Sequence, residues 1–388
     1  MNSFEFNKES FKITSIIFRV SVLLVFFLLC GSCVLHKKKV SFRSEKAFTV
    51  YLKDSIPMSV DLMFDDSNKP LKYYAHIFAP VCEEKICYPL VVDVSWDLLG
   101  NFDEYSLPID SPLTKFDHEV FNKEDVDKMH KILSDKSSVL KFYSSQDLVD
   151  SSETKKSSVV DAITGATNKT LQSSIVSGAV HSSYLLWHIV NGAAADSILQ
   201  HTESLLNDSM LTQMLESNNY HYQYYALGKI PKDRISDFLP AVIRLVGTGK
   251  EYVPYFAIEK IPEEAWMSSE TQQSILNLLN QVDFKIQNQV INKLKDKRLT
   301  EAALDKLISN FGILKPSQII KSLDTIITNQ DILDYNLLLK LACLLGNPNA
   351  ELTEKVYDLL KSQSKNFPDL EKITEKYKKG TSSTQEEK

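Results

Sequence analysis

A repeat of helix-forming sequence in the second half of the chain restricts the fold more than any other feature. Residues 226–231 read ALGKIP, residues 257–262 read AIEKIP 31 positions later, and residues 290–294 (VINKL) follow about one period further on. Aromatic runs, YHYQYY and YVPYF, precede the first two blocks, so the repeat covers more than a helix end. A period in this range is typical of stacked helical pairs, none of which buries its apolar face alone.

Residues 194–378 show hardly a strand signal and resemble a HEAT-like α-solenoid, an all-α fold that would present a concave surface to a partner. The alternative is an irregular helical bundle, because only two blocks match closely. The last stretch, residues 379–388, lacks apolar periodicity and is expected to be a disordered, solvated tail.

The first half of the chain has a different pattern, and 388 residues exceed what one core usually holds. Four apolar or alternating runs between residues 47 and 96 predict strands. A turn-rich stretch, residues 98–117, comes next, and then a helix that Asn122 caps with Asp125 three positions on. A second helix is expected from Asn168 to about Val190, ended by Asn191 and Gly192. Residues 45–193 therefore predict an α+β domain.

The first 40 residues read as a targeting segment. Residues 20–35 contain no charge and are flanked by basic residues, so the rest of the chain is expected outside the cytoplasm. Small residues precede Cys33, which resembles a bacterial lipoprotein cleavage site with Cys33 as the lipid attachment residue. An uncleaved signal anchor is the alternative. Either form predicts a protein tethered to a membrane of the cell envelope and facing the periplasm or the exterior.

Cysteine spacing allows three roles for Cys82 and Cys87. They are close enough in sequence to form a disulfide in an oxidising compartment, to act as a reversible dithiol, or to contribute two metal ligands. Cys343 lies in an apolar run, LLLKLACLLG, and is expected to be buried. The net charge of −6, with scattered basic residues, gives no reason to expect a nucleic-acid partner.

Residues 161–167 (DAITGAT) fit the pattern D-x-x-[ST]-G-A-[ST]. This segment resembles the FMN-binding domain of the flavin subunits of sodium-pumping quinone reductases and Rnf-type complexes. The resemblance implies that a periplasmic flavin transferase joins the FMN phosphate to a hydroxyl as a phosphoester. The linkage residue would be Thr167, and the other cofactor-binding residues would be Asp161, Thr164, Gly165 and Ala166.

Elementary chemistry is consistent with that resemblance. A hydroxyl that attacks a phosphoanhydride must be exposed, and Gly165 and Ala166 remove side-chain bulk beside Thr167. If a helix opens near Asn168, its unpaired N–H groups would face the attached phosphate. The alternative is that TGAT merely caps a helix, which requires no ligand.

Other candidate residues have weaker signals. Trp96 ends a strand and would either line a flavin or fill the core. His118 would either relay protons or stabilise a turn with Asp117. His181 and His188 are seven apart on one helix without a further ligand at metal spacing, so no metal site is predicted. The sequence contains no dinucleotide loop, phosphate loop or hydrolase signature.

The sequence therefore predicts a membrane-anchored, extracytoplasmic flavoprotein that exchanges electrons with a membrane redox partner through covalent FMN. A helical-repeat interaction lipoprotein without flavin is the alternative. In a third possibility, Cys82 and Cys87 form a dithiol that exchanges electrons with the flavin.

Overall fold

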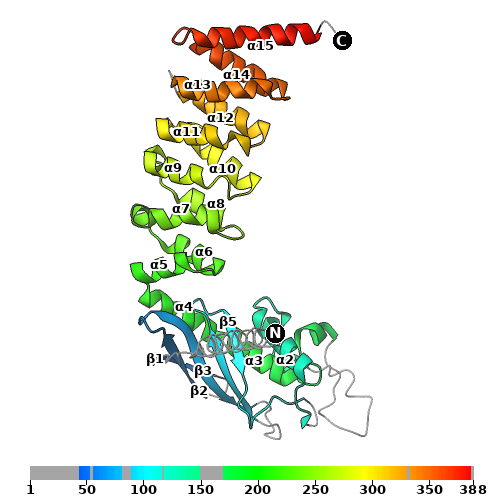
Figure 1. The fold of residues 1–388 in the computed structure, drawn as a ribbon. Coiled ribbons are helices and arrows are strands. Elements are labelled where there is room, and N and C mark those ends of the chain that lie inside the picture. Colours follow the sequence, from blue (N-terminus) through cyan, green and yellow to red (C-terminus); the bar gives the residue numbers. More distant parts are fainter. Residues whose placement is uncertain are drawn as a thin grey trace, which may run out of the picture. The chain divides into compact units, whose positions relative to one another are not determined.

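The computed structural model describes residues 43–52, 56–80, 89–115, 118–148, 169–329 and 333–385. An α+β unit precedes an all-α unit (Figure 1). The first compact unit comprises the residues up to Asp97 and those from Phe102 to Leu186, and the second comprises Leu98–Asn101 and the residues from Trp187 onward. The sequence pattern puts the boundary after residue 193.

The first unit contains a five-stranded antiparallel sheet in which each strand pairs with the next along the chain. The four strands predicted between residues 47 and 96 are confirmed, and β5 is an addition within the stretch expected to be turns. Its sequence, FDEYS, is short and mostly polar, which is common in edge strands, and β5 has one neighbour in the sheet. The strands are β1 (Arg43–Tyr51), β2 (Pro57–Phe64), β3 (Pro70–Ala79), β4 (Leu90–Trp96) and β5 (Phe102–Ser106).

Alternation along the strands separates a buried face of the sheet from an open one. Tyr73, Ala75 and Ile77 of β3 are buried, whereas the residues between them are half-buried or exposed. The order of buried and open positions has a period of two, as an antiparallel sheet with one solvated face requires. Helix α2 (Lys123–Ser134) contacts β5.

Helix α2 begins where the sequence predicts. The Asn122 side chain accepts a hydrogen bond from the Asp125 N–H at 2.9 Å, and the Asp125 carboxylate accepts one from the Asn122 N–H at 3.0 Å. This reciprocal capping box satisfies two N–H groups that the first turn leaves without partners. The three-residue spacing of the two side chains was enough to predict it.

The prediction of a single helix over residues 168–190 is wrong. The structure has a six-residue 3-10 helix, η6 (Lys169–Ser174), and then α3 (Val180–Asn191). Gly178 lies between them at φ +76°, a conformation that interrupts a right-handed helix and favours glycine. The predicted end at Asn191 and Gly192 is confirmed, since α4 (Ala193–Leu205) follows with Gly192 as its N-cap.

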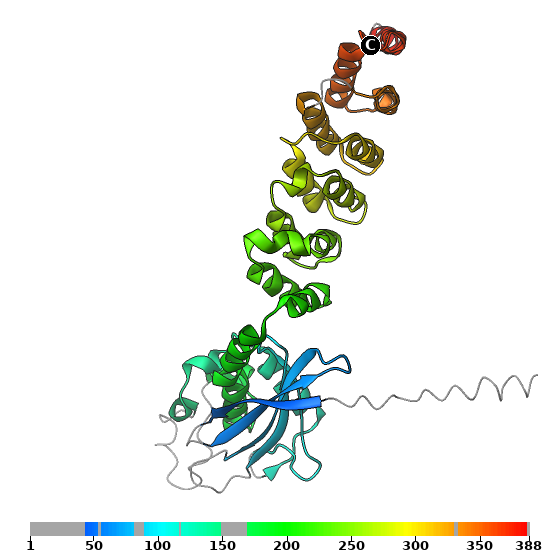
Figure 2. The same ribbon diagram turned by 90° about the vertical axis from the view of Figure 1, so that its left-hand side faces the viewer.

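Beyond α4 the second unit consists of helices at a regular interval (Figures 1 and 2). The odd-numbered helices from α5 to α15 begin at residues 208, 239, 269, 301, 335 and 369, so the interval is 30–34 residues. Their bounds are α5 (Asp208–Glu216), α7 (Leu239–Thr248), α9 (Ser269–Asn277), α11 (Glu301–Ser309), α13 (Tyr335–Ala342) and α15 (Asp369–Gln385). The intervening helices are α6 (Tyr220–Lys229), α8 (Val253–Lys260), α10 (Phe284–Leu294), α12 (Pro316–Asn329) and α14 (Ala350–Gln363).

Contacts join these helices into two rows. The first row is α5, α7, α9, α11 and α13, each touching the next, and the second row is α6, α8, α10, α12 and α14. The blocks ALGKIP and AIEKIP include the ends of α6 and α8, so the sequence repeat marks adjacent helices of the second row. Each helix covers the apolar face of its neighbour.

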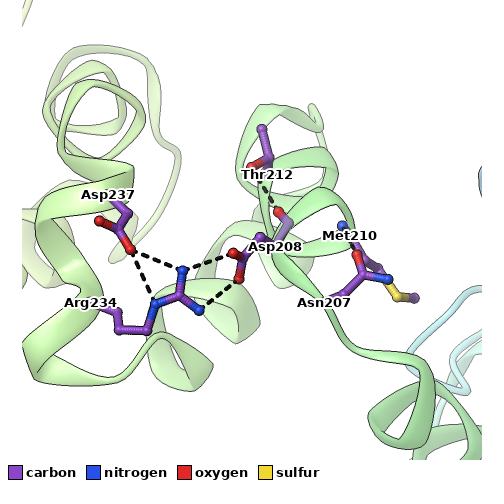
Figure 3. Close-up of polar contacts among 6 residues, drawn as sticks. All are labelled: Asn207, Asp208, Met210, Thr212, Arg234 and Asp237. Carbon is purple, nitrogen blue, oxygen red and sulfur yellow. Dashed lines mark hydrogen bonds and ion pairs between the residues drawn. The ribbon is translucent and has the colours of Figure 1, made fainter.

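Ion pairs also connect one repeat to the next. Arg234 donates from Nη1 and Nη2 to both carboxylate oxygens of Asp208, at 3.0 and 2.8 Å, and from Nε to Asp237 at 3.1 Å (Figure 3). The hydrogen bond from Arg234 lowers the pKa of Asp208. In each of these pairs the cation comes from the later repeat: Lys229–Glu203, Arg234–Asp208, Lys293–Glu259, Lys297–Glu263, Lys340–Asp305 and Lys355–Asp324.

Helix α15 extends to Gln385 and so runs into the stretch 379–388 that composition predicts to be disordered. Over the residues that the structure describes, no helix combines the length and the apolar character needed to cross a membrane.

Candidate functional site

The predicted flavin-attachment motif, with Asp161, Thr164, Gly165, Ala166 and Thr167, lies outside the described residues. The structure does describe the chain on both sides of it. Leu148 ends the 3-10 helix η4 (Ser145–Leu148), Leu171 belongs to η6, and both side chains are fully buried.

Chain geometry limits where Thr167 can be. It precedes Lys169, the first residue of η6, by two positions, which span at most about 7 Å when extended. The start of η6 is therefore the described element that lies nearest to Thr167 along the chain.

An exposed aromatic side chain lies on the element that packs against η6. The 3-10 helix η3 (Val139–Phe142) contacts η6 and holds Leu140 in the core, but its Phe142 is 75% exposed. Lys141 Nζ lies 4.6 Å from the centroid of the Phe142 ring. A ring and an ammonium group thus face solvent beside η6, a combination suited to a flat aromatic ligand that carries a phosphate.

A second cation contacts η6. Lys128 of α2 donates from Nζ to the carbonyl oxygen of Gln172 at 3.2 Å, and this bond holds the ammonium group against η6. A six-residue 3-10 helix has a weak dipole, so the expected phosphate site at an α-helix N-terminus is not what the structure provides. Lys128 is thus a described cation in contact with η6, and Lys141 belongs to η3, which packs against η6.

The turn before α3 is held by a charged cluster. Lys115 Nζ lies 2.8 Å from the Asp125 carboxylate and 3.1 Å from that of Glu119, and the Lys115 side chain packs against Gly178. The hydrogen bond from Lys115 lowers the pKa of Asp125, and the bonds to Asp125 and Glu119 raise the pKa of Lys115. This cluster ties the start of α2 to the turn after η6.

The structure gives the positions of Trp96 and His118, for each of which the sequence left two roles open. Trp96 is fully buried opposite Tyr73 of β3, which is the position that the core alternative predicts. His118 is exposed at φ +60°, in a turn, while Asp117 lies outside the described residues. The turn role of His118 is thus compatible with its backbone, and its suggested partner is not described.

The cysteine predictions have mixed outcomes. Cys33, Cys82 and Cys87 lie outside the described residues. The burial predicted for Cys343 is wrong, since it is exposed. Helix α13 ends at Ala342 and buries Leu337, Leu338 and Leu341, whereas Cys343 begins the 3-10 helix η10 (Cys343–Gly346) and is exposed.

His181 and His188 both lie on α3, as expected from their seven-residue spacing, and the His188 ring is 5.0 Å from that of Trp187. In the described part of the chain, no group of three or more His, Cys, Asp or Glu side chains is arranged to hold a metal ion.

Sequence reasoning missed a polar cluster on the open face of the sheet. The Asp93 carboxylate accepts a hydrogen bond from the Tyr74 hydroxyl at 2.6 Å and lies 2.8 Å from His76 Nδ1. Burial and the bond to Asp93 raise the pKa of Tyr74 to about 12. Burial tends to raise the pKa of Asp93, but the bonds from Tyr74 and His76 outweigh it and lower that pKa.

The signal for this cluster was present as alternation. Asp93 interrupts the apolar run of β4, and His76 and Tyr74 alternate with apolar residues in β3. The pairing of the strands, which places His76 opposite Asp93, could not be read from the sequence.

Comparison of the chain with models of known protein families, with curated proteins and with solved structures finds no match.

Proposed function

We propose that this protein is a membrane-anchored, extracytoplasmic flavoprotein that carries FMN as a phosphoester on Thr167 and passes electrons between a membrane donor and an extracytoplasmic acceptor. The segment DAITGAT supports this proposal most, because it places the Thr167 hydroxyl after two small residues and begins with an acidic residue. The uncharged run within the first 40 residues supports the extracytoplasmic location.

Attachment requires a group transfer to the Thr167 hydroxyl. The Thr167 oxygen bonds to the flavin-bearing phosphorus of a phosphoanhydride while the P–O–P bond breaks, and the other phosphate leaves and takes up the proton that the hydroxyl releases. The small side chains of Gly165 and Ala166 would let a periplasmic flavin transferase approach. When bound, FMN supplies an isoalloxazine ring that accepts and releases electrons.

The described residues near η6 suit this cofactor. Lys128 and Lys141 would neutralise the phosphodiester, and the exposed ring of Phe142 would offer a flat surface for stacking. Buried Leu148 and Leu171 would fix the two ends of the segment that holds Thr167.

The anchor and the helical unit complete the proposal. Acylation of Cys33, or an uncleaved signal segment, would hold the chain at the membrane. The two rows of helices at an interval of 30–34 residues support a HEAT-like solenoid that binds a partner.

One test is in-gel flavin fluorescence of the protein made in cells that contain a periplasmic flavin transferase. Wild type and Thr167→Ser should give a fluorescent band after denaturation, and Thr167→Ala should not. Thr170→Ala, which changes the same residue type three positions on, is the matched control and should remain fluorescent. A colourless wild-type protein would contradict the proposal.

The second candidate is an interaction lipoprotein without flavin, and the size of the helical unit favours it. It predicts that neither the wild type nor any variant is fluorescent, while the helical unit still binds its partner. If the flavoprotein also uses Cys82 and Cys87 as a dithiol, Cys82→Ser should abolish turnover and leave flavin attachment unchanged.

A further inference from the structure

Two neighbouring repeats present the same pair of side chains. Lys229 Nζ lies 5.3 Å from the ring centroid of Tyr225 on α6, and Lys260 Nζ lies 5.2 Å from that of Phe256 on α8. The two pairs are 31 residues apart, and α6 contacts α8. Rings and ammonium groups therefore recur in register on adjacent helices.

The aromatic surface continues between the two helices. Tyr224 of α6 is 52% exposed, and its ring centroid is 4.8 Å from that of Phe256. The core requires apolar residues at the buried positions of each repeat, such as Ala226 and Ala257. Tyr224 is mostly exposed and contributes little to that core, so core packing does not explain an aromatic side chain at this position beside the half-buried Phe256.

The charge on this surface is unevenly balanced. Lys229 pairs with Glu203 at 2.6 Å, and Glu259, which adjoins Lys260, pairs with Lys293 at 2.9 Å. Lys260 and Lys232 form no ion pair with a carboxylate within the described ranges. Burial, and then the nearby charge of Lys232, lower the pKa of Lys260, as expected for two cations without a counter-ion.

We propose that Tyr224, Phe256, Lys232 and Lys260, the aromatic–lysine face, bind an acidic peptide segment of a partner protein. An apolar side chain of the peptide packs on the two rings, and flanking carboxylates pair with the two lysines, so the charges are complementary. Packed helices lie about 8–10 Å apart, and three residues of extended chain span about 10 Å. The residues on either side of that apolar side chain can thus reach both repeats. This inference does not depend on the flavin.

The test measures fluorescence anisotropy of a fluorescein-labelled peptide of repeated Glu-Phe-Glu with the full chain. Peptides of the same length with Glu-Ser-Glu and Lys-Phe-Lys repeats probe the ring and the charge separately. The variant is Lys232→Ala/Lys260→Ala. Its matched control is Lys250→Ala/Lys321→Ala, which removes the same charge from two exposed lysines elsewhere in the helical unit.

We expect Glu-Phe-Glu to bind most tightly, with an affinity that falls as salt rises. The Lys232→Ala/Lys260→Ala variant should weaken binding about tenfold and reduce the salt dependence, whereas the control should stay within about twofold. Tyr224→Ser should weaken binding, and Tyr51→Ser, an exposed ring in β1, should not.

Three results would overturn the inference. The first is that the Glu-Phe-Glu peptide does not bind. The second is that the Lys-Phe-Lys peptide binds as tightly as Glu-Phe-Glu. The third is that the two double variants bind Glu-Phe-Glu with the same affinity. Binding to phosphatidylglycerol vesicles in place of the peptide, with the same dependence on Lys232 and Lys260, would instead assign this face to a lipid surface. Circular dichroism of each variant shows whether a loss reflects unfolding.

Discussion

Gln272→Ala is expected to destabilise the helical unit strongly, because this fully buried side chain joins two repeats. Its Nε2 donates to the carbonyl oxygens of Trp266 and Arg298, at 2.9 and 3.0 Å, and its Oε1 accepts from the Thr300 N–H at 3.0 Å. Truncation leaves two carbonyls and one N–H without these partners. At about 1 kcal/mol for each lost bond, plus desolvated groups left behind, the loss is about 3–4 kcal/mol.

Gln273→Ala is the matched control on the next position of α9. Gln273 is half-buried and bonds to Ser269 of its own helix, at 2.9 Å to Oγ, so its removal should cost about 0.5 kcal/mol. The assay is urea unfolding followed by circular dichroism, with the slope of the transition recorded.

Because each repeat is stabilised by its neighbours, Gln272→Ala should also broaden or split the transition at the α9–α11 junction. Equal urea midpoints for Gln272→Ala and Gln273→Ala would contradict this prediction, since they would show that the buried amide adds no stability between the repeats.

Two further predictions concern the first unit and a matched helix position. Gly178→Ala should destabilise the protein by about 1–2 kcal/mol, because φ is +76° and the added Cβ would meet Lys115 Cβ at 3.3 Å. Gly228→Ala should stabilise α6 by about 0.5–1 kcal/mol, because an added Cβ there meets nothing within 4 Å. Thermal melts of the two variants compare these effects. Asp93→Asn should cost about 1 kcal/mol at neutral pH. The pKa of Asp93 is lowered in the folded state, so the carboxylate stabilises the fold at pH values above its unfolded pKa of about 4. This stabilisation is lost as the pH falls through the folded pKa. The difference in unfolding free energy between wild type and Asp93→Asn should therefore narrow in acid. A constant difference down to pH 2 would contradict the assigned role of that carboxylate.

Local rules predicted the parts of the fold that depend on local interactions. The capping box at Asn122 and Asp125 depends on a three-residue spacing, and the strands depend on alternation, so both could be predicted. The register of the helical repeat followed from ALGKIP and AIEKIP for the same reason.

The features that the sequence did not predict depend on contacts between residues distant in the chain. The interruption at Gly178 lies beside the Lys115 side chain, which is distant in sequence. Cys343 looked buried because its neighbours are apolar, but the end of α13 at Ala342 turns it outward. The pairing of His76 with Asp93 required the strand register, which alternation alone does not give.

The central claim is covalent flavin on Thr167, and mass analysis of one tryptic peptide tests it most directly. Cleavage after Lys156 and Lys169 releases residues 157–169 (SSVVDAITGATNK), which hold Thr167. In protein made with a periplasmic flavin transferase, this peptide should be heavier than its unmodified form by the mass of FMN less one water, and fragmentation should locate the added group on Thr167. An unmodified peptide at full yield, or an adduct on Thr164 or a serine, would contradict it.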